Sequence, residues 1–230
     1  MADDKGRMIE YASNGGSTPG YLVLPEGDGP FPGVVAIQEW WGLNAHMQAI
    51  AERLAGAGFV ALVPDLYHGQ IAEEPDEARK LSMALNREKA IQEISAAGHY
   101  LIGLDEVAPK QVGLVGWCMG GALSLSTAAH NGVVGAAVCF YGRPLEASDT
   151  ARINAPVLGL YGELDAGIPA SIVHDFEKEL EKNGVTHDIH MYAGAQHAFF
   201  NDTRPQSYHA EAAEDAWARM LTWFRTHLTA

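Results

Sequence analysis

The chain has 230 residues, 47% of them hydrophobic and 19% charged, a composition that is typical of globular proteins and excludes a disordered chain. Asp and Glu number 29 against 15 Lys and Arg, and the formal charge of −14 argues against a nucleic-acid-binding protein, which needs a concentrated basic face. Two cysteines, Cys118 and Cys139, are too few for a disulfide framework and favour a reducing compartment.

The first residues of the chain are polar and acidic, and no apolar run approaches the roughly 20 residues of a membrane-spanning helix. We therefore expect a cytoplasmic protein without a membrane partner. Residues 1–230 are predicted to form a single domain, as a monomer or a small homo-oligomer.

Short apolar runs that favour strands alternate along the chain with longer stretches that favour helices. Strands are predicted at residues 9–11, 21–24, 33–37, 59–64, 111–116, 133–141, 156–161 and 186–192. The first two are expected to pair as a hairpin. Helices are predicted at 44–54, 118–130, 171–183 and 210–228, and a helical stretch with at least one break from 75 to about 101. This alternation predicts an α/β fold with a mainly parallel central sheet and helices on both faces.

Active sites in such sheets lie beyond the carboxyl ends of the strands, and the segment that follows the strand at 111–116 carries the strongest functional signal. It places Cys118 between Gly116 and Gly120, before an Ala-rich helix, which is the context of a nucleophile elbow with the pattern G-x-Nuc-x-G. The free N–H groups at the start of that helix would favour the reactive thiolate. Taken alone, the segment could also hold a buried core cysteine beside a glycine turn.

An elbow nucleophile needs an acid and then a histidine later in the chain, each after a strand. Asp165 follows the predicted strand at 156–161, and His197 follows the last predicted strand. A single loop Asp or His is commonly a turn residue or a solvated side chain, but the order and the positions together favour a catalytic triad of Cys118, Asp165 and His197. Glu163 is the nearest rival acid, and Asp165 is preferred because it lies deeper in the loop.

The segment Gln38-Glu39-Trp40-Trp41-Gly42 follows the strand at 33–37. In an elbow hydrolase the loop after this strand supplies one oxyanion-hole donor, and the residue after the nucleophile supplies the other. The predicted donors are therefore the backbone N–H groups of Trp40 and Met119. Glu39 lies at the expected mouth of the site, where an unpaired carboxylate is costly, so we interpret it as a functional residue rather than a surface acid.

The sequence indicates neither a metal site nor a cofactor. The histidines other than His197 lack a matched ligand cluster, and His187 and His190 point to opposite faces of one predicted strand. No G-x-G-x-x-G follows a strand, and no Walker lysine pattern is present. Cys139 lies inside an apolar strand and is expected to be a packing residue.

These motifs resemble those of the dienelactone hydrolase family in the α/β-hydrolase superfamily, and the similarity extends across nearly the whole chain. The resembling segments are residues 38–42, 63–67, 113–121, the loop around Asp165, and 197–201. The resemblance implies an α/β-hydrolase fold with Cys118 as nucleophile, Asp165 as orienting acid and His197 as general base. It also implies that Glu39 contacts the nucleophile and helps to convert the thiol to the thiolate when substrate arrives.

The implied reaction opens the ring of an enol-lactone, carboxymethylenebutenolide (dienelactone), to give maleylacetate through an acyl-thioester in chlorocatechol degradation. Family members that act on this lactone hold its carboxylate with arginines, one of them four residues past the catalytic histidine, where this chain has Asn201. This departure predicts a broader preference that includes neutral activated esters. The candidates to contact the small-molecule lactone or ester are Arg79, Arg87, Trp117, Phe199, Asn201 and Arg204.

Two other functions are compatible with the sequence. The first is a promiscuous carboxylesterase that acts on other activated esters. The second is a non-catalytic member that binds a ligand or responds to oxidation through Cys118. A complete triad argues against a mere binding module, and redox sensing would benefit from a resolving cysteine, for which Cys139 is expected to be too buried.

Overall fold

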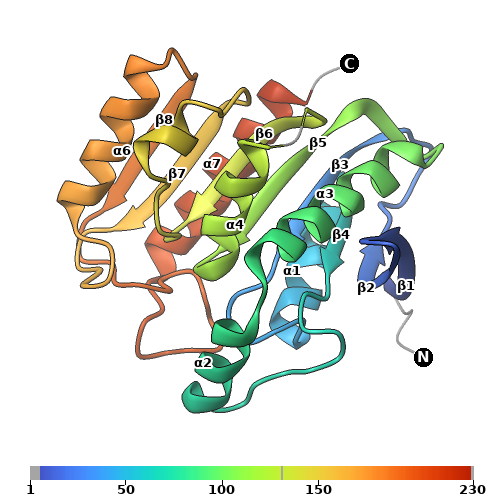
Figure 1. The fold of residues 1–230 in the computed structure, drawn as a ribbon, viewed down its shortest axis with the longest axis horizontal. Coiled ribbons are helices and arrows are strands. Elements are labelled where there is room, and N and C mark those ends of the chain that lie inside the picture. The colour runs from blue at the N-terminus through green and yellow to red at the C-terminus, as the bar shows by residue number, and fades with distance from the viewer. Residues whose placement is uncertain (1–5, 131, 229–230) are drawn as a thin grey trace.

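An eight-stranded sheet forms the centre of the computed structural model, which describes residues 6–130 and 132–228 (Figure 1). The strands are β1 (Gly6–Ser13), β2 (Gly16–Val23), β3 (Phe31–Ile37), β4 (Val60–Pro64), β5 (Val107–Trp117), β6 (Val134–Phe140), β7 (Val157–Gly162) and β8 (His187–Tyr192). The helices are α1 (Ala45–Gly56), α2 (Pro75–Ala84), α3 (Arg87–Gly103), α4 (Met119–Ala128), α5 (Ala147–Thr150), α6 (Ala170–Lys182) and α7 (Ala210–His227).

The strands lie in the order β1-β2-β4-β3-β5-β6-β7-β8. β1 and β2 form the predicted antiparallel hairpin, and β2 also pairs antiparallel with β4. The pairs from β4 through β3 to β8 are all parallel. The predicted α/β fold with a mainly parallel sheet is therefore confirmed, and the carboxyl ends of six strands meet at one edge.

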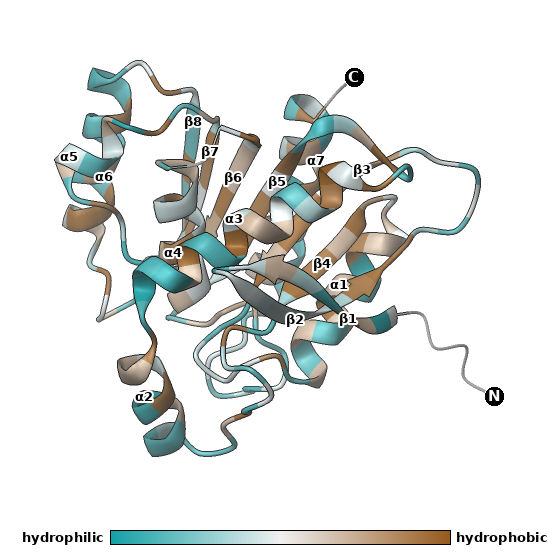
Figure 2. Cartoon of the chain, turned by 45° about the vertical axis from the view of Figure 1, so that its right-hand side comes forward, coloured by the Kyte–Doolittle hydropathy of each residue, from teal (hydrophilic) through white to brown (hydrophobic). Residues whose placement is uncertain are grey.

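Helices cover both faces of the sheet. α1 and α7 pack on one face, where Val34 joins Leu54 of α1 and Phe224 of α7 in one apolar cluster. α3, α4 and α6 pack on the other face, where the next strand residue, Val35, joins Ile94 of α3. The two valines face opposite ways because successive side chains of a strand alternate. Figure 2 shows the central strands as the most hydrophobic part of the fold.

The helix boundaries follow local signals in the sequence. The Asn44 side chain accepts a hydrogen bond from the Met47 N–H, 3.1 Å away, and caps α1 as predicted. The predicted break in the helical stretch lies between α2 and α3, where the Asn86 side chain caps α3. β5 begins four residues earlier than predicted, because Val107 pairs with Phe31 on β3 before a register shift. The short helix α5 was not predicted.

In the described part of the chain, none of the helices combines the length and the apolar character that crossing a membrane requires. α2 and the segment between β8 and α7 lie beyond the carboxyl edge of the sheet (Figure 1). These two segments and the loops that follow β3, β5, β6 and β7 surround the site described next.

Candidate active site

Cys118 occupies a tight turn between β5 and α4, with φ of +54°. It precedes the first residue of α4 rather than lying inside the helix as predicted. Glycine is required on both sides, because a Cβ on Gly116 would collide with the backbone of Gly120, and one on Gly120 with the backbone of Ile37. The turn therefore exposes the thiol at the carboxyl edge of the sheet and at the positive end of the α4 dipole.

Asp165 and His197 meet beside this turn. The Asp165 Oδ2 lies 2.6 Å from the His197 Nδ1, and the Oδ1 accepts from the N–H groups of Gly167 and Ile168, at 2.8 and 3.1 Å. Burial would raise the pKa of Asp165. The hydrogen bond and the charge of His197, together with the backbone N–H groups of Gly167 and Ile168, hold this pKa below its usual value. Asp165 is thus an ionised acceptor that fixes the imidazole.

Glu163, the rival acid, does not contact the histidine. Its side chain is exposed and accepts a hydrogen bond from the Gly194 N–H, 3.1 Å away. Asp165, in contrast, is 4% exposed. The turn after β7 therefore directs the second acidic side chain, and not the first, toward His197.

The His197 ring is oriented by Asp165 on one side and by Tyr141, which packs edge-on at a centroid distance of 5.1 Å, on another. Burial lowers the pKa of His197, but the hydrogen bonds and charges of Asp165 and Cys118 outweigh it and raise this pKa to about 10. The ring is therefore basic and adjacent to the thiol. Because Nδ1 faces Asp165, Nε2 is the nitrogen that can exchange a proton at the site.

Glu39 is buried in the wall of the site and accepts hydrogen bonds on both oxygens. The Tyr141 hydroxyl donates to Oε1 at 3.2 Å, and the Asn201 amide donates to Oε2 at 2.6 Å. Burial raises the pKa of Glu39 above its usual value, and both donors and the charges of His197 and Arg204 only partly counter this rise. Asn201 is therefore a partner of Glu39.

A cavity of about 590 Å³ opens over Cys118 and His197. Trp40, Trp41 and Leu164 form much of its apolar wall, and Leu164 is also exposed to solvent at the rim. The cavity is thus large enough for a small organic substrate and presents apolar surface next to the thiol.

Arg204 is the arginine that lines this cavity. Its half-buried guanidinium stacks on Trp41, 3.8 Å from the ring centroid, an arrangement that stabilises a cation. Within residues 6–130 and 132–228, no acidic side chain forms an ion pair with it. A guanidinium that lines the cavity and forms no ion pair there is well suited to bind an anionic group, and its charge also acts on the buried carboxylate of Glu39.

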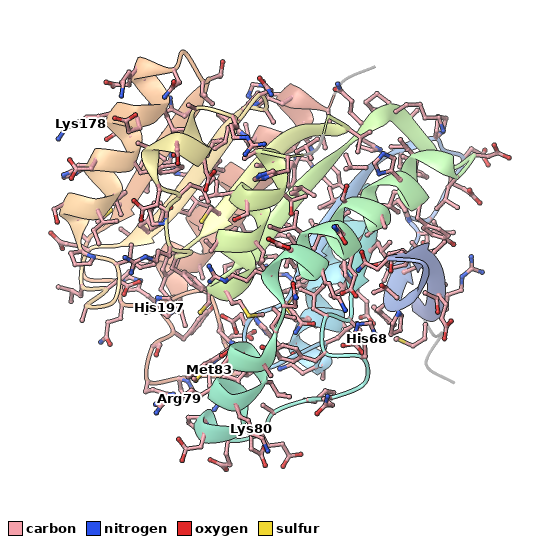
Figure 3. All side chains as sticks on the ribbon, viewed as in Figure 1. His68, Arg79, Lys80, Met83, Lys178 and His197 are labelled. Atoms are coloured by element: carbon pink, nitrogen blue, oxygen red, sulfur yellow. The ribbon has the colours of Figure 1, made fainter. Side chains whose placement is uncertain are left out.

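The other five candidate substrate contacts do not line this cavity. Arg79 and Arg87 are exposed on α2 and α3, and Figure 3 shows Arg79 on α2, beyond the carboxyl edge of the sheet. Trp117 and Phe199 are buried in the apolar core that supports the turn. Asn201 is 1% exposed and faces Glu39. These residues lie near the motifs in the sequence, but the sequence does not show the direction in which each side chain points.

Of the two predicted oxyanion donors, Trp40 lines the cavity. Met119 directly follows Cys118 as the first residue of α4, so its N–H has no acceptor inside the helix. Tyr141 was missed by the sequence analysis, although its position directly after β6, at the carboxyl end of a strand, was an available signal. Among the described residues, no group of three or more His, Cys, Asp or Glu side chains could hold a metal ion.

Comparisons with known proteins agree with this geometry. Residues 18–228 match the model of the dienelactone hydrolase family. The chain is 37% identical to protein usf of Aquifex pyrophilus, over 97% of this chain and 100% of that protein. It is 35% identical to the "Putative carboxymethylenebutenolidase" of Aquifex aeolicus, over 97% and 99% of the two chains. A solved dienelactone hydrolase-like promiscuous phosphotriesterase from metagenomic libraries shares 26% identity, with a TM-score of 0.88 over 97% of this chain and 98% of its own.

Proposed function

Because the chain belongs to the dienelactone hydrolase family and is a hydrolase of esters or lactones, we propose that it uses Cys118 as its nucleophile on a small lactone or carboxylic ester. The observation that carries this proposal is the meeting of three parts at one cavity: the thiol at the elbow, the His197 ring beside it, and the Asp165 carboxylate 2.6 Å from Nδ1. A reducing cytoplasm, which we propose as the location, keeps this thiol available.

The first chemical step forms an acyl-thioester. The thiol proton of Cys118 passes to Nε2 of His197, and the thiolate attacks the carbonyl carbon of the substrate. The N–H groups of Trp40 and Met119 stabilise the oxyanion, by several kcal/mol in comparable sites. When the C–O bond breaks, the leaving oxygen takes the proton from His197; in a lactone this oxygen stays attached to the acyl chain.

The second step releases the product. His197 removes a proton from water, the hydroxide attacks the thioester carbonyl, and the thiolate of Cys118 leaves and regains its proton. Asp165 keeps the imidazole in the required tautomer and stabilises the imidazolium in both steps. These steps use only side chains and backbone groups of this chain together with water.

For the substrate, we favour a carboxylate-bearing enol-lactone of the dienelactone type, hydrolysed to maleylacetate in aromatic degradation. Arg204 supports this choice, because an unpaired cation in the cavity offers a forked donor to a carboxylate. A promiscuous carboxylesterase is the second candidate, and the apolar wall formed by Trp40, Trp41 and Leu164 supports it.

Hydrolysis of p-nitrophenyl acetate and of dienelactone by wild type and Cys118→Ala tests the nucleophile. We expect the variant to lose several orders of magnitude in kcat/KM for both substrates while its far-UV circular dichroism stays unchanged. Cys118→Ser keeps the base and the oxyanion donors and should retain a little activity. If Cys118→Ala stays within about tenfold of wild type, a difference of only ~1.4 kcal/mol, Cys118 is not the nucleophile.

A further inference from the structure

The turn that follows β7 places a large apolar side chain at the mouth of the cavity, directly before Asp165. Leu164 lines the cavity and is 57% exposed to solvent. Its backbone N–H donates to the carbonyl oxygen of Ala195, 2.9 Å away, so the turn is tied to the segment that follows β8. Leu164 therefore stands in a fixed position and offers apolar surface that a bound molecule can cover.

The acidic side chains on either side of Leu164 are already engaged. Glu163 accepts a hydrogen bond from a backbone N–H, and the Asp165 carboxylate is held by the triad histidine and two backbone N–H groups. Ala166 and Gly167 of the same turn also line the cavity. The surface that this turn adds to the cavity, apart from Asp165, is thus apolar.

The order of the strands determines the side of Cys118 on which this surface lies. Along the carboxyl edge of the sheet, β3, β5, β6, β7 and β8 follow one another. Trp40 comes after β3, whereas the turn with Leu164 comes after β7, on the other side of the elbow. Because neighbouring strands lie about 4.8 Å apart, β7 is roughly 10 Å from β5, in the direction away from Trp40.

The reaction assigns a part of the substrate to that side. In the proposed mechanism the carbonyl oxygen faces the N–H of Trp40, and the leaving oxygen takes its proton from Nε2 of His197, which requires hydrogen-bond reach between the two atoms. His197 comes after β8, so the C–O bond that breaks points from the β3 side toward the β7 and β8 side. The group attached to the leaving oxygen therefore continues toward Leu164.

The cavity has room for such a group. Its volume of about 590 Å³ lies within the range of about 300–1,000 Å³ that is typical of pockets for drug-sized ligands. We infer that Leu164 forms the contact surface of a leaving-group subsite, and that the substrates include esters whose alcohol part is an apolar alkyl or aryl group.

This inference rests on the proposed function, in which Cys118 is the nucleophile and His197 protonates the leaving oxygen. Leu164 determines specificity and takes no part in the bond changes. Hydrolysis of such an ester consumes one water and releases a carboxylic acid and an apolar alcohol. In a lactone, the corresponding group is an apolar substituent on the ring carbon that bears the leaving oxygen.

The test compares two series of neutral esters that both begin with ethyl acetate. The alcohol part lengthens in ethyl, butyl and hexyl acetate, and the acyl part lengthens in ethyl acetate, ethyl butyrate and ethyl hexanoate. Hexyl acetate and ethyl hexanoate are isomers, so they match in size and in total apolar surface. The two series differ only in the side of the scissile bond on which the methylene groups lie.

A fully buried methylene group contributes about fourfold to kcat/KM, and one against a partly open wall about twofold. Wild-type kcat/KM should therefore rise roughly tenfold from ethyl to hexyl acetate. Leu164→Ala, and Leu164→Gln, which keeps the size of the side chain but makes its end polar, should reduce this rise to about threefold or less. The rise along the acyl series should change by less than about twofold in both variants.

Met83→Ala is the matched control, because Met83 is another exposed apolar side chain, on α2, that does not line the cavity (Figure 3). Both series should keep their wild-type profiles in this variant. Each rise is a ratio within one variant, so a general loss of activity caused by a change next to Asp165 cancels.

The inference is overturned if wild type shows no rise along the alcohol series, which includes a failure to hydrolyse the alkyl acetates. It is equally overturned if the rise survives in both Leu164 variants, if the acyl series falls by the same factor, or if Met83→Ala lowers the rise as much. Failure of the proposed function appears separately, as hydrolysis of p-nitrophenyl acetate that Cys118→Ala retains.

Discussion

Substitution of Arg204 by glutamine separates the two candidate substrate classes. Arg204 carries the positive charge that faces the cavity, and the indole of Trp41 supports its guanidinium from one side. Glutamine retains part of the stem and a hydrogen-bonding end but removes the charge and the fork. If a substrate carboxylate binds here, Arg204→Gln should weaken its productive binding and leave a neutral ester of similar size unaffected.

The expected magnitude follows from the half-buried position of the guanidinium. A hydrogen bond to a charged group contributes about 1.5–3 kcal/mol, which corresponds to roughly 10-fold to 150-fold in kcat/KM. The lower end applies if water reaches the pair, and the upper end if the substrate excludes it. For p-nitrophenyl acetate the change should stay within about threefold, because no charge pairs with the guanidinium in that reaction.

The assay compares kcat/KM for dienelactone and p-nitrophenyl acetate at low and high salt in wild type, Arg204→Gln, Arg79→Gln and Arg87→Gln. The last two are matched controls, since both arginines are exposed and lie outside the cavity wall. Wild-type activity on dienelactone should fall with salt, and Arg204→Gln should remove most of this dependence. Equal losses on both substrates in Arg204→Gln, or a selective loss in Arg79→Gln, would refute the assignment of the anion site.

Two further predictions concern the acid and its pair with the histidine. Asp165→Asn should lower kcat by orders of magnitude, because the imidazole loses the tautomer in which Nε2 accepts a proton, whereas Glu163→Gln should remain close to wild type; the opposite ranking in an ester assay would transfer the role to Glu163. The pair should also make stability depend on pH. The stabilisation through His197 is complete below its unfolded pKa of about 6.5 and is lost as the pH rises through about 10. The stabilisation through Asp165 is present above its ordinary pKa of about 3.8 and is lost as the pH falls through its lower folded value. The difference in Tm between wild type and Asp165→Asn should therefore be widest near pH 5–6 and shrink toward both ends; a difference that does not change with pH would contradict the pairing.

The sequence by itself determined the class of fold and the positions of the chemistry. Apolar runs such as residues 33–37 and 133–141 are too short for buried helices and too continuous for exposed strands, so they predict a parallel sheet covered on both faces. The glycine at position 116 has a local cause, because a Cβ there would collide with the backbone of Gly120 in the same turn. Asn44 and Asn86 mark helix starts for an equally local reason, because each caps the helix that follows it.

Only the tertiary structure decided which side chains face one another at the carboxyl edge. Arg79, Arg87 and Arg204 are equivalent candidates in the sequence, and Arg204 lines the cavity because the segment between β8 and α7 folds back onto Trp41. Asn201 was expected to face the substrate, but it lies against Glu39, 162 positions away in the chain. Tyr141 likewise reaches Glu39 across 102 positions. Contacts between residues so far apart in the chain depend on how the strands pair in the sheet. The hydrophobic periodicity of a single segment does not determine that pairing.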